Sequence, residues 1–350
     1  MNVISVKASG QYDVIIDSNL LPKTGEYIKN IQDCGKAAII SDSNVWPIYG
    51  KTVASSLKES GFKPVEFVFP AGESSKNATT YLQILNFLAK NAISRSDVII
   101  ALGGGVVGDI TGFAAATFLR GVPYVQIPTS LLAMVDSSVG GKTAIDLPAG
   151  KNLVGAFKQP QLVLCDVETL CSLPDNQFCD GCAEVIKYGM LYDADLLRLL
   201  SESGASFDRE PVIARCIALK RDVVQEDEFD TGARQKLNLG HTIGHGIEAG
   251  SHYTISHGQA VAAGMAIVTR AAAAKGYCEF TVSEAIEACL IQFGLPSKTE
   301  FNAEQLFQAA LSDKKRSGCS VNLIIPREIG CCDIVPTPVS ELKSFIEAGL

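Results

Sequence analysis

The sequence predicts two domains: an α/β, Rossmann-like domain over residues 1–169 and an all-α domain over residues 170–350. Short apolar runs alternate with helical patterns as far as about residue 169, and beyond it strand signals nearly vanish while helical periodicity continues. A chain of 350 residues has room for about two domains. Its 47% hydrophobic and 19% charged residues are typical of a compact protein with a large core.

The first domain begins with a predicted hairpin, in which Val3–Ala8 and Tyr12–Ile16 are strands joined by a Ser9-Gly10 turn. After the hairpin, strands and helices alternate, which implies a mainly parallel sheet covered on both faces. The further strands are expected at 36–41, 65–69, 97–102, 124–127 and 161–166. The helices between them are expected at 47–60, 78–91 and 109–119.

The second domain is predicted from helical periodicity alone. The domain boundary is expected between Asp166 and Pro174, where the texture of the sequence changes. The expected helices are 182–201, 212–226, 242–249, 261–275 and 282–293.

Composition excludes several classes of function. A net charge of −8 argues against binding to nucleic acid or to an anionic membrane, so an anionic substrate would need a local cluster of Lys and Arg. No apolar run reaches the roughly 18 to 20 residues of a membrane span. The eleven cysteines are scattered and follow no signal peptide, so we expect reduced thiols in a cytoplasmic protein. Cys179 and Cys182 form a solitary CxxC pair, which lacks the second pair of a four-thiolate zinc site.

A glycine-rich turn, Gly103–Asp109, follows a predicted strand and opens a predicted helix, the context of a GxGxxG nucleotide-binding motif. A tight strand-to-helix turn would need glycines in any case. The turn also lies on a late strand and lacks an acidic residue about 20 positions further on. Asp42, at the end of another strand, is the alternative ribose-binding acid, which suggests a nucleotide bound by several loops at the strand ends.

Further polar loops follow the strands. Glu73 and Lys76 lie in one of them, and Thr129 and Ser130 in another. The segment 136–152 adds Lys142, Lys151 and Asn152, an anion cradle that Arg120 supplements. Gly-Gly-Lys-Thr within it resembles the end of a P-loop, but the first glycine of that motif would fall at Asp136, so a P-loop is not expected. The alternative is a solvated loop.

All four histidines fall between residues 241 and 257, which points to one site for metal binding or proton transfer. His241 and His245 are four residues apart and would share a helical face. A metal held by histidines commonly takes a carboxylate as third ligand. The alternative is a helix start with incidental histidines. For Glu184 and Lys187, which are three residues apart, spacing alone favours a simple surface ion pair.

Taken together, these segments resemble the 3-dehydroquinate synthase family, within the sugar-phosphate cyclases. The resemblance covers nearly the whole chain, in the family's order. The matching strings are GGGVVGD (103–109), VDSSVGGKT (135–143), GKNLVGAF (150–157), AEVIKYG (183–189), LNLGHTIGH (237–245) and HGQAVAAGM (257–265).

The resemblance implies an enzyme that uses NAD⁺ and Zn²⁺, with Co²⁺ as an alternative metal, and that is usually a homodimer. Residues 1–169 would bind NAD⁺, and residues 170–350 would bind zinc and substrate. The implied reaction converts 3-deoxy-D-arabino-heptulosonate 7-phosphate into 3-dehydroquinate and phosphate, a step of the shikimate pathway. It would proceed by transient oxidation, β-elimination of phosphate, reduction and intramolecular aldol closure.

The resemblance also assigns residues by matching position. The zinc ligands would be Glu184, His241 and His257. The residues at the substrate would be Arg120, Asp136, Lys142, Asn152, Lys187, Lys220, Asp230, Arg234, Asn238 and His245. The residues at NAD⁺ would be Asp42, Glu73, Lys76, Gly104, Gly105, Val106, Val107, Gly108, Asp109, Thr129, Ser130, Lys142, Lys151 and Thr169. Arg120 would reach in from a partner subunit, and one of Lys314 or Lys315 would join the carboxylate grip.

The chain departs from the family pattern at three positions. Asp230 stands where glutamate is usual, Ser130 replaces a threonine, and Asp146 replaces an asparagine. Three rival functions remain open at this stage. They are a sister cyclase such as 2-deoxy-scyllo-inosose synthase or a valiolone synthase, a metal-dependent polyol dehydrogenase of the glycerol dehydrogenase type, and a non-enzymatic sensor of NAD or zinc.

Overall fold

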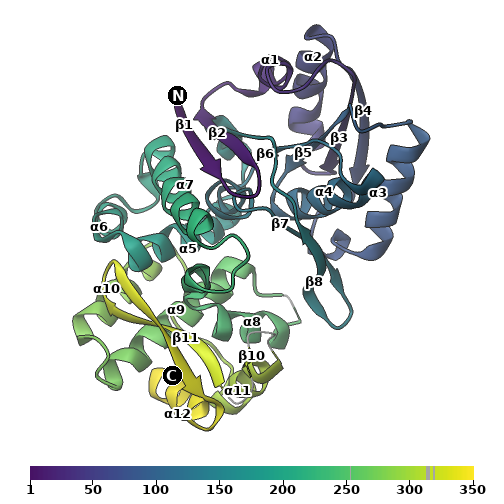
Figure 1. Ribbon diagram of the computed structural model, residues 1–350. Helices are drawn as coiled ribbons and strands as arrows, with labels where there is room; N and C mark the ends of the chain where they lie inside the picture. Colours follow the sequence, from purple (N-terminus) through teal and green to yellow (C-terminus); the bar gives the residue numbers. More distant parts are fainter. Residues whose placement is uncertain (253, 313–315, 318–319) are drawn as a thin grey trace. The chain divides into compact units, whose positions relative to one another are not determined.

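The structure, a computed structural model, describes residues 1–252, 254–312, 316–317 and 320–350. The chain forms two compact units (Figure 1). The first unit comprises Met1–Pro174 and Arg209–Phe229, and the second comprises Asp175–Asp208 and Asp230–Leu350. The segment Arg209–Phe229 therefore belongs to the first unit, although the sequence division put it in the second domain. Its helix α7 (Arg209–Glu226) packs against strands β1 and β2.

A seven-stranded sheet forms the centre of the first unit, in the order β1-β2-β9-β6-β5-β3-β4. Its strands are β1 (Asn2–Lys7), β2 (Gln11–Asp17), β3 (Lys36–Asp42), β4 (Lys63–Phe69), β5 (Val98–Gly103), β6 (Tyr124–Pro128) and β9 (Leu162–Asp166). Only β1 and β2 pair antiparallel, as the predicted hairpin, and the other neighbours are parallel. The α/β fold class predicted for this half of the chain is confirmed.

Both faces of this sheet are buried because apolar residues fill successive positions of its strands. In β3, Ala37 and Ile39 join one core, together with residues of α1 (Thr24–Lys29) and α2 (Lys51–Glu59). Ala38 and Ile40 join the other core, together with residues of α3 (Ala78–Lys90) and α4 (Gly105–Thr117). Because successive residues of β3 face two different helical layers, both sets are buried and the sequence of the strand is continuously apolar.

A separate hairpin of β7 (Lys142–Leu147) and β8 (Gly150–Phe157) completes the first unit, and the sequence analysis did not predict it. Most of β8 is exposed, so its side chains give no buried period-two pattern. Short helical turns also connect the strands of the sheet. They are η1 (Leu21–Lys23), η2 (Trp46–Gly50), η3 (Glu73–Ser75), η4 (Phe118–Arg120), η5 (Ala133–Ser137) and η6 (Val167–Ser172).

The second unit is mainly helical, as predicted, and α9 lies at its centre. This helix packs against α5, α8, α10 and α12. The helices are α5 (Asp175–Tyr192), α6 (Ala194–Ser203), α8 (His241–Gly250), α9 (His257–Ala274), α10 (Phe280–Gln292), α11 (Ala303–Ser312) and α12 (Val339–Gly349), with turns η7 (Gly204–Ser206) and η8 (Ala233–Asn238). The helix expected over 182–201 is divided at Asp193, whose side chain caps α6 by accepting from the Leu196 N–H.

This helical unit also contains a small antiparallel sheet that the sequence analysis missed. Its order is β10-β11-β12, with β10 at Arg316–Ser317, β11 at Ser320–Glu328 and β12 at Cys331–Pro338. Gly330, with φ of 86°, turns the chain between the last two strands. Among the described residues, no helix is long and apolar enough to cross a membrane.

Candidate active site

Most of the residues predicted to bind a nucleotide lie at one edge of the parallel sheet, because they follow the carboxyl ends of its strands. Lys142 and Lys151 lie instead on the hairpin of β7 and β8. Asp42 ends β3, and Glu73 and Lys76 follow β4. The glycine-rich turn follows β5, Thr129 and Ser130 follow β6, and Thr169 follows β9. Five neighbouring parallel strands thus bring together residues that span more than 120 positions of the sequence.

The glycine-rich turn is closely packed at this edge. Helix α4 begins at Gly105, four residues before the predicted start. A Cβ on Gly104 would lie 3.3 Å from the Ser130 hydroxyl, and one on Gly105 would lie 3.2 Å from the Ser137 hydroxyl. No side chain among the described residues caps α4, so the N–H groups of its first turn can face an anion. This geometry fits the pyrophosphate of a dinucleotide.

Lys76 connects the neighbouring loops and is 5% exposed. Its amine lies 2.6 Å from Oδ2 of Asp109 on α4 and 2.7 Å from Oδ1 of Asn152 on β8. Burial is the main cause that raises the pKa of Asp109. Burial also acts to lower the pKa of Lys76, but the combined attraction of Asp109, Glu73 and Asp146 outweighs it and leaves that pKa raised. The ion pair between Lys76 and Asp109 therefore holds the hairpin loop against the start of α4.

The loop from Asp136 to Lys142 is held from two directions within the first unit. Lys220 of α7, 4% exposed, donates from Nζ to Oδ1 of Asp136 at 2.8 Å. The N–H of Gly140 donates to the hydroxyl of Tyr12 at 3.1 Å. Lys142 starts β7 with an exposed side chain. The loop thus presents one exposed ammonium on a fixed backbone.

Arg120 lies in a strained turn at the end of η4. Leu119 has φ of 51° and Arg120 has φ of 65°, both in the left-handed region. Arg95 supports the turn by donating from Nε to the carbonyl of Leu119 at 2.9 Å. Arg120 is exposed on the first unit. Strain of this kind persists where the surrounding structure holds it, often at functional positions.

The second unit contains a cluster of one carboxylate and two imidazoles. Glu184 lies within α5, while His241 and His257 are the first residues of α8 and α9. Oε1 of Glu184 is 3.5 Å from Nε2 of His241 and 3.4 Å from Nε2 of His257. The three ligand atoms lie within 4.8 Å of one another, and Glu184 is fully buried. Three residues separated by up to 73 positions thus converge on one point.

The far nitrogens of both imidazoles have acceptors. Nδ1 of His241 lies 3.1 Å from the Leu239 carbonyl oxygen, and Nδ1 of His257 lies 3.4 Å from Oε2 of Glu248. Both Nε2 atoms therefore point to Glu184. Burial acts to lower the pKa of His257, but hydrogen bonds to Glu184 and Glu248 outweigh it and raise the pKa to about 10. A carboxylate and two imidazoles with supported far nitrogens form the donor set of an open, catalytic zinc site.

Other predicted residues of the second unit lie beside this cluster or shortly before α8. Lys187, one turn after Glu184 and 1% exposed, forms an ion pair with it. The ring of His245 has its centroid 5.5 Å from that of His241 and 6.5 Å from that of His257, so it flanks the cluster. Arg234 and Asn238 lie in η8, directly before α8. Asp230, with φ of 60°, precedes that turn.

Two predicted assignments remain. His252 has an exposed side chain and φ of 51°, and the structural role expected for it stays a prediction. Lys314 and Lys315 lie outside the described residues.

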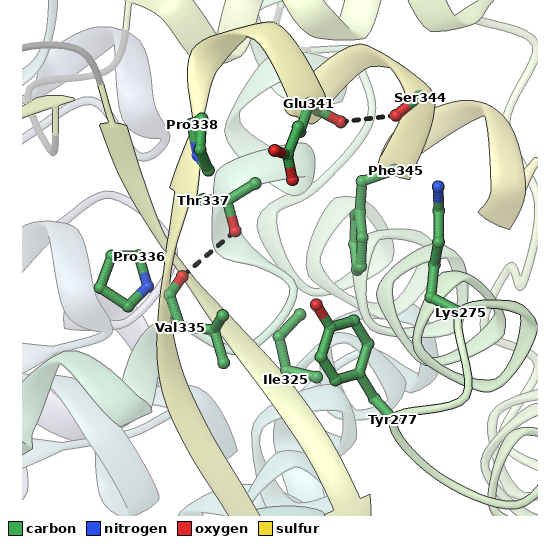
Figure 2. Close-up of a pocket in the computed structure, with 10 residues that line it drawn as sticks. All are labelled: Lys275, Tyr277, Ile325, Val335, Pro336, Thr337, Pro338, Glu341, Ser344 and Phe345. Carbon is green, nitrogen blue, oxygen red and sulfur yellow. Dashed lines mark hydrogen bonds between the residues drawn. The ribbon is translucent and has the colours of Figure 1, made fainter.

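A small cavity elsewhere in the second unit contains none of the predicted site residues (Figure 2). Its volume is about 90 Å³, and it lies between β11, β12 and α12. Lys275 and Tyr277 contribute to its wall. The hydroxyl of Thr337 donates to the Val335 carbonyl at 3.2 Å, and that of Ser344 donates to the Glu341 carbonyl at 2.9 Å. These hydroxyls are therefore satisfied locally and do not indicate a ligand.

Two acidic residues next to the cluster, Glu248 and Asp180, were not predicted from the sequence. Glu248 is 2% exposed and contacts His257. Asp180 accepts hydrogen bonds from the Ser256 hydroxyl and the Gln259 N–H, on either side of His257. Spacing offered one weak signal, since Glu248 lies two helical turns after His241 and Asp180 lies one turn before Glu184.

A parallel-sheet unit with a glycine-rich turn and a helical unit with a carboxylate–imidazole cluster define a two-unit metalloenzyme of the sugar-phosphate cyclase fold. Residues 66–180 match the family described as 3-dehydroquinate synthase N-terminal, and residues 181–316 match that described as 3-dehydroquinate synthase C-terminal. The chain belongs to the 3-dehydroquinate synthase family.

Individual relatives agree with this placement. The chain is 45% identical to the 3-dehydroquinate synthase of Pelobacter propionicus over 354 residues, which cover 99% of both chains. It is 43% identical to that of Streptococcus mutans over 343 residues, 96% of this chain and 97% of the relative. The solved 2-epi-5-epi-valiolone synthase of Streptomyces hygroscopicus, with NAD⁺ and Zn²⁺ bound, has a TM-score of 0.89 at 25% identity, covering 98% of both chains. The expected resemblance is confirmed.

Proposed function

We propose that this chain is a 3-dehydroquinate synthase, a lyase that converts 3-deoxy-D-arabino-heptulosonate 7-phosphate into 3-dehydroquinate and phosphate. The observation that carries the proposal is the cluster of Glu184, His241 and His257. It occurs in a chain 45% identical, over almost all of its length, to a synthase of that name. The alternative function, that of a sister cyclase, is less well supported, because the solved valiolone synthase shares only 25% sequence identity with this chain.

The proposed cofactors are NAD⁺ at the sheet edge of the first unit and Zn²⁺ or Co²⁺ held by Glu184, His241 and His257. When bound, they supply reversible hydride transfer and Lewis-acid polarisation. The chain itself contributes the ligands' orientation: a backbone carbonyl supports His241, and Glu248 supports His257. The first-turn N–H groups of α4 would hold the pyrophosphate of the dinucleotide.

We assign the grip on the substrate phosphate to Lys142, Asn152, Lys187, Asn238 and His245. Lys142 is exposed on its loop, and Asn152 is oriented by Lys76 at 2.7 Å. Lys187 is buried, which strengthens its interaction with an anion. Orientation by both ends of the substrate lowers the barrier, so weakening this grip should reduce turnover as well as affinity.

We assign the grip on the substrate carboxylate to Lys220 and Arg234, together with one of Lys314 or Lys315. Lys220 is 4% exposed and Arg234 is 2% exposed. Cationic side chains form strong charge-assisted hydrogen bonds with carboxylates. We therefore expect a substrate that bears a carboxylate. Asp136 accepts a hydrogen bond from Lys220 and orients it. We also assign Asp230 to the residues at the substrate.

The test is a phosphate-release assay on purified protein with the heptulosonate phosphate. Phosphate should appear only when NAD⁺ and the metal are both present, without net NADH. A sugar phosphate lacking the carboxylate should release little phosphate. Stoichiometric NADH without phosphate would instead identify a polyol dehydrogenase. Phosphate release unaffected by a chelator would contradict the proposal.

We also propose that the protein works in the cytoplasm as a homodimer in which Arg120 of one subunit serves the site of the other. The exposed, strained turn at Leu119 and Arg120 supports this role. Arg120→Ala and Glu184→Gln, each inactive alone, should regain about a quarter of the wild-type activity when mixed in equal amounts and allowed to exchange subunits. About half of the dimers are then heterodimers, and each heterodimer has one complete site. No recovery in a mixture shown to contain heterodimers would place Arg120 in its own subunit's site.

A further inference from the structure

Two carboxylates that have no role in the proposed reaction lie next to His257 or next to its neighbours in the chain. We infer that Glu248 and Asp180 are positioning residues that fix His257 for metal binding, Glu248 through the imidazole ring and Asp180 through the backbone. This inference rests on the metal site of the proposed function. It concerns residues to which the proposed function gives no role at the substrate or at NAD⁺, so metal affinity tests it independently of the reaction.

Glu248 and Glu184 hold the His257 ring between them. Oε2 of Glu248 is 3.4 Å from Nδ1, and Oε1 of Glu184 is 3.4 Å from Nε2. An acceptor at Nδ1 keeps the proton on that nitrogen, so a metal ion would take the place of the Nε2 proton and bind at Nε2. Glu248 is 2% exposed, and a carboxylate so deeply buried is costly to keep without a specific partner. The geometry therefore assigns Glu248 to the orientation of this ring.

The two histidines differ in the acceptor behind them. Nδ1 of His241 lies 3.1 Å from a backbone carbonyl oxygen, that of Leu239. Nδ1 of His257 lies next to a carboxylate, which is a stronger acceptor and carries charge. The charged acceptor makes the His257 imidazole the more basic ligand. A single side-chain substitution can remove this support from His257, whereas the support of His241 belongs to the main chain.

Asp180 fixes the backbone of the same ligand. It lies on α5, one helical turn before Glu184, and accepts from the Ser256 hydroxyl and, at 3.0 Å, from the Gln259 N–H. These donors lie at the start of α9 on either side of His257. The side chain of Ser256, the residue before α9, does not cap this helix, so the cap comes from α5. One helix thus carries the ligand Glu184 and anchors the ligand His257.

The test measures Zn²⁺ affinity by competition with a chromophoric chelator, using the full chain without substrate or NAD⁺. Glu248→Ala should weaken zinc binding about 10- to 100-fold, the range found when partners behind metal-bound histidines are removed. Glu248→Gln retains the shape and one acceptor oxygen, so a smaller loss is expected. Asp180→Ala should weaken binding about tenfold, and Asp180→Asn, which keeps an acceptor, should restore most of it.

Asp193→Ala is the matched control, because Asp193 caps α6 in the same unit by accepting from the Leu196 N–H at 3.0 Å. Its removal should lower the thermal stability of the metal-free protein but leave zinc affinity unchanged. The Co²⁺-loaded protein gives a second readout. Glu248→Gln should shift its ligand-field absorption, since the basicity of His257 falls, and Asp193→Ala should not.

The outcomes separate the inference from the proposed function. Zinc affinity within twofold of wild type in both Glu248→Ala and Asp180→Ala would overturn the inference and leave the proposed reaction intact. Equal zinc losses in Asp193→Ala and Asp180→Ala would also overturn the role of Asp180, because a general loss of helix stability would then explain it. A wild-type chain that binds no zinc would overturn the metal site and the inference together. Normal zinc dependence in a chain that releases no phosphate would overturn only the proposed reaction.

Discussion

Gly258 lies where α9 crosses α5, directly after His257, and the Gly258→Ala substitution tests whether this crossing sets the metal site. A Cβ at position 258 would overlap the carbonyl oxygen of Asp180. It would also lie 2.7 Å from the carbonyl carbon of Asp180 and 2.7 Å from its Oδ1. Two of these three atoms belong to the backbone of a helix, so rotation of a side chain cannot relieve the overlap.

The displacement that alanine demands can be worked from these distances. Carbon atoms in contact keep about 3.5–4.0 Å between them, so the start of α9 has to move away from α5 by about 1 Å. His257 precedes the substituted residue and moves with it, whereas Glu184 stays on α5. Metal–ligand distances tolerate only about 0.2 Å, so the shift exceeds what the site can absorb. We expect zinc affinity to fall at least about tenfold, and the free energy of unfolding of the metal-free protein to fall by about 1–3 kcal/mol.

Chelator competition on the purified chain gives the zinc affinity, and urea unfolding of the metal-free protein gives the stability. Gly25→Ala is the matched control. A Cβ at Gly25 would overlap the carbonyl oxygen of Ser56 and lie 2.8 Å from its carbonyl carbon, at a helix contact of the first unit. This control should lose stability to a similar extent and keep wild-type zinc affinity.

Zinc binding by Gly258→Ala as tight as that of the wild-type chain would show that the crossing of α9 and α5 does not set the metal site. Equal losses of zinc affinity in Gly25→Ala and Gly258→Ala would also refute this role, because overall destabilisation would then account for both.

Three further predictions follow from the same geometry. His257→Ala should abolish phosphate release and lower the zinc content, whereas Cys179→Ser, outside the ligand cluster, should change neither. Metal analysis and the phosphate assay measure both effects. An active, zinc-free His257→Ala protein would refute the ligand assignment. Lys220→Met should lower kcat and raise KM for the heptulosonate phosphate while NAD⁺ affinity stays near wild type; unchanged steady-state kinetics would remove Lys220 from the substrate grip. Burial acts to raise the pKa of Asp97, but hydrogen bonds from Ser94 and Lys36 outweigh it and leave the pKa below its ordinary 3.8. The ionised Asp97 side chain therefore stabilises the folded protein at pH values above 3.8. This stabilisation is lost as the pH falls through the lowered pKa. Asp97→Asn should therefore cost about 1–3 kcal/mol at neutral pH and progressively less below the ordinary pKa, and urea unfolding that shows a constant difference down to acid pH would contradict this sign.

Burial explains which strands the sequence could predict. In β3 and β5 every residue or almost every residue is buried, because helices cover both faces of the sheet, and such strands are continuous apolar runs. Strand β8 was missed because most of its residues are exposed, so no face of it is marked by apolar residues. Strand β11 contains the buried run Leu323–Pro326, but a short apolar run fits a buried helix equally well. The turn at Gly330 was the available sign of a hairpin.

The metal site shows what spacing can and cannot predict. Spacing alone favoured His241 with His245, since residues four apart share a helical face. In the structure the imidazole that shares Glu184 with His241 is that of His257, on a different helix, and His245 flanks the cluster. His257 reaches it because α9 begins against α5, where Gly258 leaves room for the Asp180 backbone. Glu248 then meets His257 across the contact between α8 and α9. These encounters depend on how three helices cross, which local periodicity does not encode, so only the resemblance to whole family motifs could identify His257 from the sequence. Glu248 and Asp180 contribute no ligand atom to the cluster, and the crossing of the helices alone brings them to it.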